Sequence, residues 1–145
     1  MTKRKKRAAV PVKGATEKDL ELLRKSTLNT YEAHRSADED DFPPERMNEY
    51  WRNRHFARTA WEHAENATFA GLVEDQKRKL PGVVASNAKL ARDVEATANA
   101  LAMLDLVSAS LSVLAETVTI LGQAIPRCRD IHTREGLSGR SRKER

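Results

Sequence analysis

Apolar residues recur along most of this chain at the three- and four-residue spacing of an amphipathic helix, and no run of Val and Ile is longer than two residues. Thr16 and Asp19 stand three residues apart, as in a capping box at the start of a helix. The residues that then fall on one helical face are Leu20, Leu23, Thr27, Tyr31 and His34. We therefore expect a first, short helix over residues 17–36.

A second helix is predicted after the acidic segment Ala37–Pro44, which ends in two prolines. Proline is favourable in a first helical turn, and acidic residues upstream complement the positive end of the helix dipole. We expect this helix over residues 43–79. Leu80, Pro81 and Gly82 predict a break, because the residue before a proline avoids the α region and glycine commonly follows a helix end. A third helix then covers residues 83–125 and ends at Pro126, so the second and third helices form a hairpin.

The third predicted helix carries seven apolar residues at alternating spacings of three and four, which is the pattern of a coiled-coil seam. These seam residues are Leu104, Val107, Leu111, Leu114, Val118, Leu121 and Ile125. A second apolar row, containing Leu106, Val113 and Ile120, indicates a helix held between two neighbours, as in a bundle or an oligomeric ring. The seam is therefore predicted to be an oligomer interface. The alternative is that this helix packs on the first two within a monomer.

The composition agrees with a helical protein: aromatic residues make up 5%, and 145 residues contain six Gly and five Pro. Sandwiches, barrels and doubly wound sheets need Val- and Ile-rich strands separated by turn residues. The predicted fold class is all-α, a short helix plus a long helical hairpin with a coiled-coil-like oligomerisation helix and disordered basic tails. The predicted organisation is a basic tail over residues 1–15, a helical oligomerisation domain over residues 16–126 and a flexible basic tail over residues 127–145.

Charge is distributed unevenly along the chain. The net charge is +5 overall, +6 for residues 1–13 and +4 for residues 127–145, which leaves −5 for residues 14–126. Basic ends on an acidic body suggest contact with a polyanion, most often nucleic acid; the alternative is that such tails are only solvated. The candidate nucleic-acid-binding residues are Lys3, Arg4, Lys5, Lys6, Arg7, Lys13, Arg127, Arg129, Arg134, Arg140, Arg142, Lys143 and Arg145.

A further group of arginine and aromatic residues lies in the second predicted helix. Arginines at positions 52, 54 and 58 are interleaved with aromatic rings, which are Tyr50, Trp51, His55 and Trp61. Guanidinium and aromatic planes together can stack on bases. The alternative is that the aromatic rings belong to the core and the arginine stems cover them.

No pattern typical of catalysis, metal binding or cofactor binding occurs. The four histidines lack metal-ligand spacing, Cys128 has no histidine partner in a folded frame, and no glycine-rich phosphate loop follows a predicted strand. We therefore expect no enzyme activity, no cofactor and no metal. The apolar stretch 98–125 contains Asp105 and Glu116, which are costly in a bilayer, so no membrane is expected. A single cysteine indicates a reducing compartment, and a cytoplasmic location is predicted.

The layout of a hairpin over Pro43–Ile125, a seam over Leu104–Ile125 and basic ends at Met1–Lys13 and Arg127–Arg145 resembles that of phage small terminase subunits. These proteins are of similar length, predominantly helical, and assemble as rings. The helix-turn-helix that many members carry is not evident. The resemblance implies binding of viral DNA and regulation of a large ATPase–nuclease subunit during genome packaging, in the cytoplasm of a bacterial host.

The leading hypothesis is thus a homo-oligomeric, non-enzymatic protein that binds nucleic acid, with DNA favoured over RNA as the ligand. The viral packaging subunit is the most specific version of this hypothesis. One alternative is a helical interaction or assembly factor without a nucleic-acid role. Another is a helical accessory subunit of a plasmid-transfer or RNA-guided complex.

Overall fold

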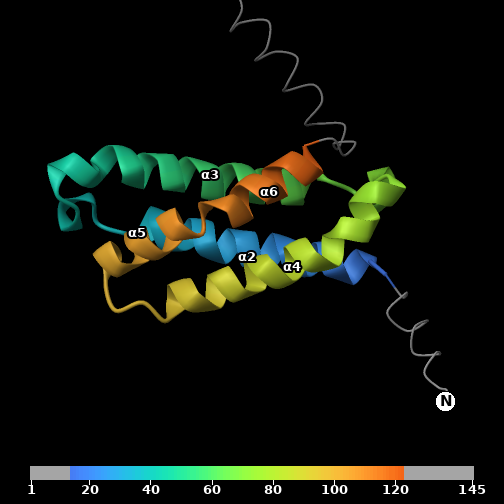
Figure 1. Ribbon diagram of the computed structural model, residues 1–145, viewed down its shortest axis with the longest axis horizontal. Helices are drawn as coiled ribbons and strands as arrows, with labels where there is room; N and C mark the ends of the chain where they lie inside the picture. Colours follow the sequence, from blue (N-terminus) through green and yellow to red (C-terminus); the bar gives the residue numbers. More distant parts are fainter. Residues whose placement is uncertain (1–13, 123–145) are drawn as a thin grey trace, which may run out of the picture.

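The computed structural model describes residues 14–122, and in this part of the chain all regular structure is helical. Four helical columns lie side by side and alternate in direction along the chain (Figure 1). Helix α2 (Glu17–Ser36) packs against α3 (Met47–Asn66) and α4 (Glu74–Glu95). The fourth column consists of α5 (Ala100–Ala109) and α6 (Leu111–Leu121), and it also packs against α3 and α4. Three short 3-10 turns, Glu39–Asp41, Pro44–Arg46 and Phe69–Gly71, lie in the connections.

The prediction of a first helix over residues 17–36 is confirmed by α2. Its start is fixed locally: the Asp19 amide donates to the Thr16 hydroxyl at 3.3 Å, and the Thr16 amide donates to the Asp19 carboxylate at 2.9 Å. This reciprocal pair satisfies two amides that no helical carbonyl can reach.

The prediction of a second helix over residues 43–79 is wrong at its C-terminal end, because α3 ends at Asn66 and residue 67 is extended. Arg24 of α2 stabilises this end by donating to the carbonyl oxygens of Ala64 at 2.9 Å and Ala67 at 3.0 Å. The chain then turns through Phe69–Gly71 and buries Leu72 before α4 begins. A tertiary contact from a residue forty positions away thus stops the helix.

The predicted break at Leu80, Pro81 and Gly82 is also wrong, because all three residues lie inside α4. The exposed Pro81 removes one backbone donor, yet the neighbouring Leu80 and Val83 are buried in the core. Burial of these side chains offsets the lost hydrogen bond, and the first turns of α4 are set at an angle to the remainder (Figure 1).

The predicted third helix over residues 83–125 is divided, within the described residues up to 122, among three separate helices. Helix α4 ends at Glu95, and Asn99 begins α5 by accepting a hydrogen bond from the Ala102 amide at 2.8 Å. Ser110 separates α5 from α6, and the two helices are bent by 56° relative to each other. The heptad pattern therefore continues across a bend. Within residues 14–122 no single helix is long and apolar enough to cross a membrane. The bent pair α5–α6, taken together, has the necessary length and apolar composition.

The apolar seam lies in the core of the single chain, which corrects its assignment to an oligomer interface. Leu104, Val107 and Leu114 are fully buried and Leu121 nearly so. Leu111 and Val118 are half-buried against the same core, and Ile125 lies outside the described residues. The reason is that α5 and α6 close the bundle against α3 and α4, which covers the apolar stripe that a third helix would otherwise expose.

Candidate nucleic-acid interface

The thirteen candidate nucleic-acid-binding residues, together with Cys128 and His132, lie outside the described residues 14–122. They are Lys3, Arg4, Lys5, Lys6, Arg7, Lys13, Arg127, Arg129, Arg134, Arg140, Arg142, Lys143 and Arg145. The bundle does fix where the two basic segments join it. Gly14 precedes the start of α2 and Gly122 follows the end of α6, and both lie at the same end of the bundle (Figure 1).

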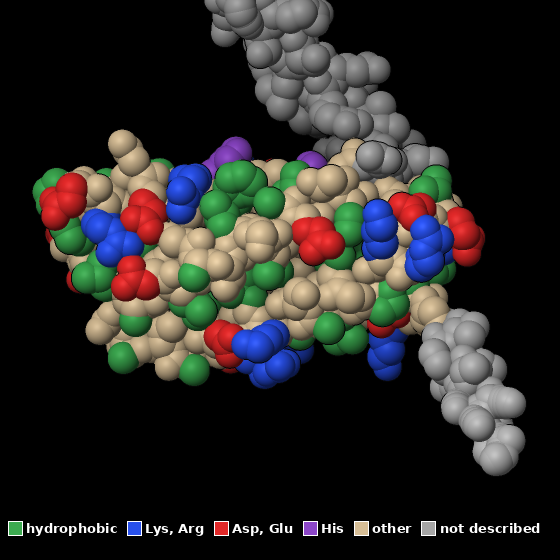
Figure 2. Space-filling model, viewed as in Figure 1, with side chains coloured by type: hydrophobic (Ala, Val, Ile, Leu, Met, Phe, Trp, Pro, Cys, Tyr) green, Lys and Arg blue, Asp and Glu red, His purple; other side chains and the backbone are tan. Residues whose placement is uncertain are grey.

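Helix α3 presents an exposed aromatic ring beside arginines. Trp51 is 43% exposed, and the guanidinium carbon of Arg54 lies 5.0 Å from the centroid of its ring. Arg58 is exposed one further turn along this face and pairs with Glu62 at 2.9 Å. Basic and acidic side chains both lie along the edge of the molecule that α3 forms (Figure 2). A partly exposed indole stacked with a guanidinium is the arrangement on which an unpaired base can stack.

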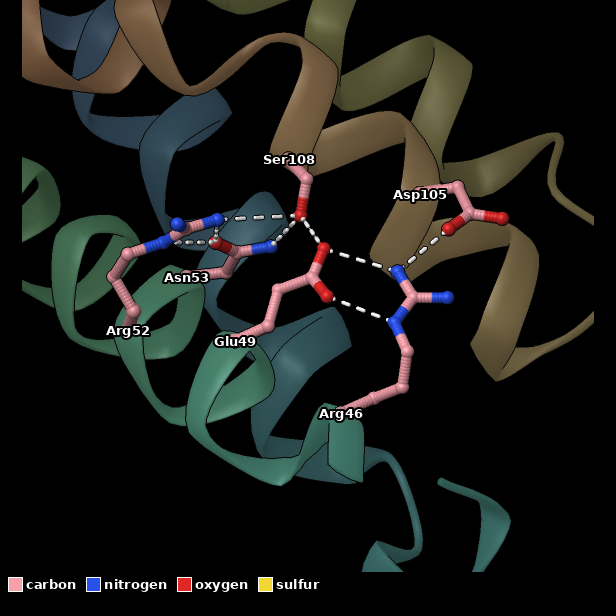
Figure 3. Close-up of polar contacts among 6 residues, drawn as sticks. All are labelled: Arg46, Glu49, Arg52, Asn53, Asp105 and Ser108. Atoms are coloured by element: carbon pink, nitrogen blue, oxygen red, sulfur yellow. Dashed lines mark hydrogen bonds and ion pairs between the residues drawn. The ribbon is translucent and has the colours of Figure 1, made fainter. Parts of the chain in front are cut away.

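Arg52 lies on the flank of α3 that faces α5, because residues 52 and 54 stand about 160° apart around a helix. Its Nε and one Nη donate to the side-chain oxygen of Asn53 at 3.1 and 2.9 Å, and the same Nη lies 3.4 Å from the Ser108 hydroxyl (Figure 3). Among residues 14–122 neither Arg52 nor Arg54 forms an ion pair with a carboxylate. The positive charge of Arg54 therefore remains available to an anionic partner, whereas that of Arg52 also attracts the nearby Glu49 carboxylate.

A polar network joins this part of α3 to α5 (Figure 3). Arg46 donates two hydrogen bonds to Glu49, at 2.8 and 3.0 Å, and a third to Asp105 of α5 at 2.7 Å. Ser108 donates to Glu49 and accepts from the amide of the fully buried Asn53 at 2.9 Å. Bidentate arginine–carboxylate pairs are geometrically specific, so the network fixes the register of α3 against α5.

The ionisation of these groups follows from the same contacts. The hydrogen bonds from Arg46 and Ser108 lower the pKa of Glu49 to about 2, and those to Glu49 and Asp105 raise the pKa of Arg46 above its ordinary value. A hydrogen bond to the Tyr50 hydroxyl raises the pKa of Arg54. Both arginines and Glu49 are thus charged at neutral pH, and the network is an ionic one.

The aromatic residues of α3 divide between the core and the surface. Tyr50 is fully buried, stacks on Phe42 at 4.6 Å and donates to the His34 carbonyl at 2.7 Å. Trp61 is half-buried and stacks on Tyr31 at 5.7 Å. Core packing therefore accounts for Tyr50 and most of Trp61, whereas Trp51 lies on the outer face.

Gly122, which leads to the C-terminal basic segment, lies beside the same helix. A Cβ atom placed on Gly122 would lie 3.7 Å from the ring of His63, near the end of α3. Residue 127 can extend about 18 Å from Gly122. Since one residue of α3 rises 1.5 Å, this reach covers the helix surface back to Trp51. A nucleic acid on the α3 face is therefore accessible to the first cations of that segment.

The part of the chain that the structure describes contains no group of three or more His, Cys, Asp or Glu side chains that could hold a metal ion. No protein-family model matches the chain, and no curated protein or solved structure is significantly similar to it.

The α3–α5 network is a feature that the sequence patterns missed. Arg46 and Glu49 precede their partners Asp105 and Ser108 by almost sixty residues. The only local hint is the three-residue spacing of Arg46 and Glu49, which is common on helix surfaces and does not identify the distant partners.

Proposed function

We propose that this chain is a non-enzymatic nucleic-acid-binding protein. In this proposal its basic terminal segments supply the attraction to phosphates, and the α3 face positions bases. The observation that carries the proposal is that Gly14 and Gly122, which lead to the two basic segments, lie at one end of the bundle, with Gly122 beside α3. Trp51 and Arg54 on that helix then lie within reach of the same ligand.

The distribution of charge supports this assignment of phosphate attraction to the terminal segments and of base positioning to α3. Residues 14–122 contain thirteen Lys and Arg against eighteen Asp and Glu, so the bundle as a whole repels phosphate. Binding through released counterions must come from the terminal segments, while Arg52 and Arg54 add local positive charge. Contacts of this kind position a protein without reading sequence.

The test is a fluorescence-anisotropy titration of the full chain with a labelled 20-nucleotide single strand and a 20-base-pair duplex, between 50 and 200 mM salt. We expect both to bind, with a dissociation constant that rises at least tenfold over this range, because several phosphate contacts are replaced by salt ions. Undetectable binding at 50 mM salt, or binding indifferent to salt, contradicts the proposal.

Variants separate the α3 face from general electrostatics. The double change Arg52→Gln and Arg54→Gln is expected to weaken binding more than the control Lys89→Gln and Arg92→Gln, which removes two exposed charges from α4. Trp51→Ala is expected to weaken single-strand binding by about 5- to 150-fold, the range for losing one base–aromatic stack, and to leave duplex binding nearly unchanged. Equal losses for the two charge variants would remove α3 from the proposal.

The viral packaging subunit is the more specific form of the same proposal. Of the parts on which the resemblance to small terminases rests, the hairpin broken at residues 80–82 and the intersubunit seam differ from the described bundle. Of the features behind the resemblance, only the basic terminal segments still support a packaging subunit. Its test is co-purification with a large ATPase–nuclease subunit and assembly of a ring; a full chain that remains small with DNA present would exclude it.

A further inference from the structure

A groove opens at the end of the bundle opposite to Gly14 and Gly122. It has a volume of about 380 Å³ and lies between the C-terminal ends of α2 and α4 and the start of α5. Ala33, Val94 and Met103 contribute small or apolar lining, and Asp38, Asp41 and Glu95 contribute carboxylates. An occupant that fits must therefore combine apolar side chains with positive charge.

The carboxylates of the groove have no cation to neutralise them within the described bundle. Asp38, Asp41 and Glu95 form no ion pair there, and the adjacent Glu39 and Asp40 form none either. Asp38 accepts a hydrogen bond from the Asp40 amide at 3.0 Å, which stabilises the turn but adds no positive charge. This concentration of negative charge favours a cationic segment.

We propose that the groove binds the N-terminal segment Lys3–Val12 of a second copy of this chain. That segment reads KRKKRAAVPV: five consecutive cations followed by small and apolar residues. Its cations match the carboxylates, and its apolar part matches the lining of the groove. The C-terminal segment fits less well, since its basic residues are interrupted by Asp130, Glu135 and Glu144.

The length of chain decides between its own groove and that of a second copy. Helix α2 has 20 residues and is about 30 Å long, and the groove lies at its far end. Ala8 is six residues before Gly14 and extends at most about 22 Å from it. The apolar residues 8–12 therefore cannot reach the groove of their own chain. They reach the groove of a neighbour that runs antiparallel, and two such copies fill both grooves in a closed two-fold dimer.

The proposal engages the same N-terminal cations as the proposed nucleic-acid contact, and it is tested in the absence of nucleic acid. A full chain with Ala8→Cys and Cys128→Ser, carrying a nitroxide at position 8 and no isotope label, is mixed with ¹⁵N-labelled wild-type chain. At low salt we expect broadening of the labelled amides at residues 33–37 and 95–100, and its loss at 0.5 M salt. Broadening only when nitroxide and isotope share one chain, or no broadening, overturns the proposal. Broadening by a nitroxide at Ser141→Cys, with none by a nitroxide at position 8, also overturns the proposal.

A matched pair of variants tests whether the groove itself is responsible. Asp38→Asn with Asp41→Asn removes two charges that line the groove, and the asparagine at position 38 retains its cap. Glu39→Gln with Asp40→Asn removes two charges from the same turn that do not line it. We expect at least a fivefold weaker dimer for the first pair and less than twofold for the second, by sedimentation at low salt. Equal effects would show that the groove is not the binding site. The amide spectrum of each variant checks that the bundle remains folded.

Discussion

Replacing Leu114 by alanine tests whether the apolar seam of α5 and α6 belongs to the core of one chain. Leu114 is fully buried in the cluster that contains Tyr50, Leu104 and Val107. Leucine-to-alanine changes at such sites cost about 3–5 kcal/mol, because burial is lost and a cavity remains. With an unfolding entropy of about 2.1 cal/mol/K per residue, a domain of about 110 residues loses roughly 13–22 °C in Tm.

The assay is thermal unfolding followed by circular dichroism at 222 nm, in 0.5 M salt and at two protein concentrations differing twentyfold. Leu111→Ala is the matched control, because Leu111 occupies an equivalent heptad position but is only half-buried; we expect about 1 kcal/mol there. If the core is intramolecular, Leu114→Ala lowers Tm strongly, Leu111→Ala lowers it slightly, and no Tm depends on protein concentration. Equal losses, or a wild-type Tm that rises with concentration, would refute this assignment of the seam.

Three further outcomes are expected. The lowered pKa of Glu49, about 2 against 4.5, stabilises the fold above pH 4.5, and this contribution is lost as the pH falls toward 2; Glu49→Gln should remove that part of the pH dependence in urea titrations. Burial lowers the pKa of His34 below its ordinary value of 6.5, so the fold loses stability as the pH falls below 6.5; the midpoint of a ring ¹⁵N titration should lie below 6.5, and a midpoint at or above 6.5 would contradict this. Gly82→Ala should raise the unfolding free energy by about 0.5–1 kcal/mol, because a Cβ there meets nothing within 4 Å and alanine favours helix; a lower Tm would show that the bend in α4 needs glycine.

Local patterns predicted those elements whose ends are fixed by local contacts. The capping box of Thr16 and Asp19 lies within one turn, and α2 has the predicted bounds. The end of α3 could not be predicted in this way, because it depends on Arg24 from another helix. The break predicted at Pro81 was wrong for a related reason. The cost of one missing hydrogen bond is outweighed by the burial of Leu80 and Val83, which only the folded bundle provides. Asn99 is a recognisable cap residue whose signal was hidden by the continuous apolar pattern around it.

The candidate interface divides in the same manner. Interleaved arginine and aromatic residues at 50–61 identified the segment, but not which rings face outward. That requires knowing that Tyr50 points toward Phe42 and His34, which leaves Trp51 on the outer face. The heptad spacing likewise identified four of the buried residues of α5 and α6, which are Leu104, Val107, Leu114 and Leu121. Spacing alone does not specify whether the covering helix comes from the same chain, and here α3 and α4 cover them.

The central claim, that the α3 face contacts nucleic acid, is tested most directly by the fluorescence of Trp51. The chain contains two tryptophans, so Trp61→Phe, which preserves a ring against Tyr31, makes Trp51 the sole reporter. Titration with a single-stranded 20-mer at 50 mM salt should quench and shift its emission, and 0.5 M salt should reverse the change, because base stacking on the indole depends on electrostatic attraction. An unchanged Trp51 spectrum at DNA concentrations that saturate anisotropy would contradict the claim.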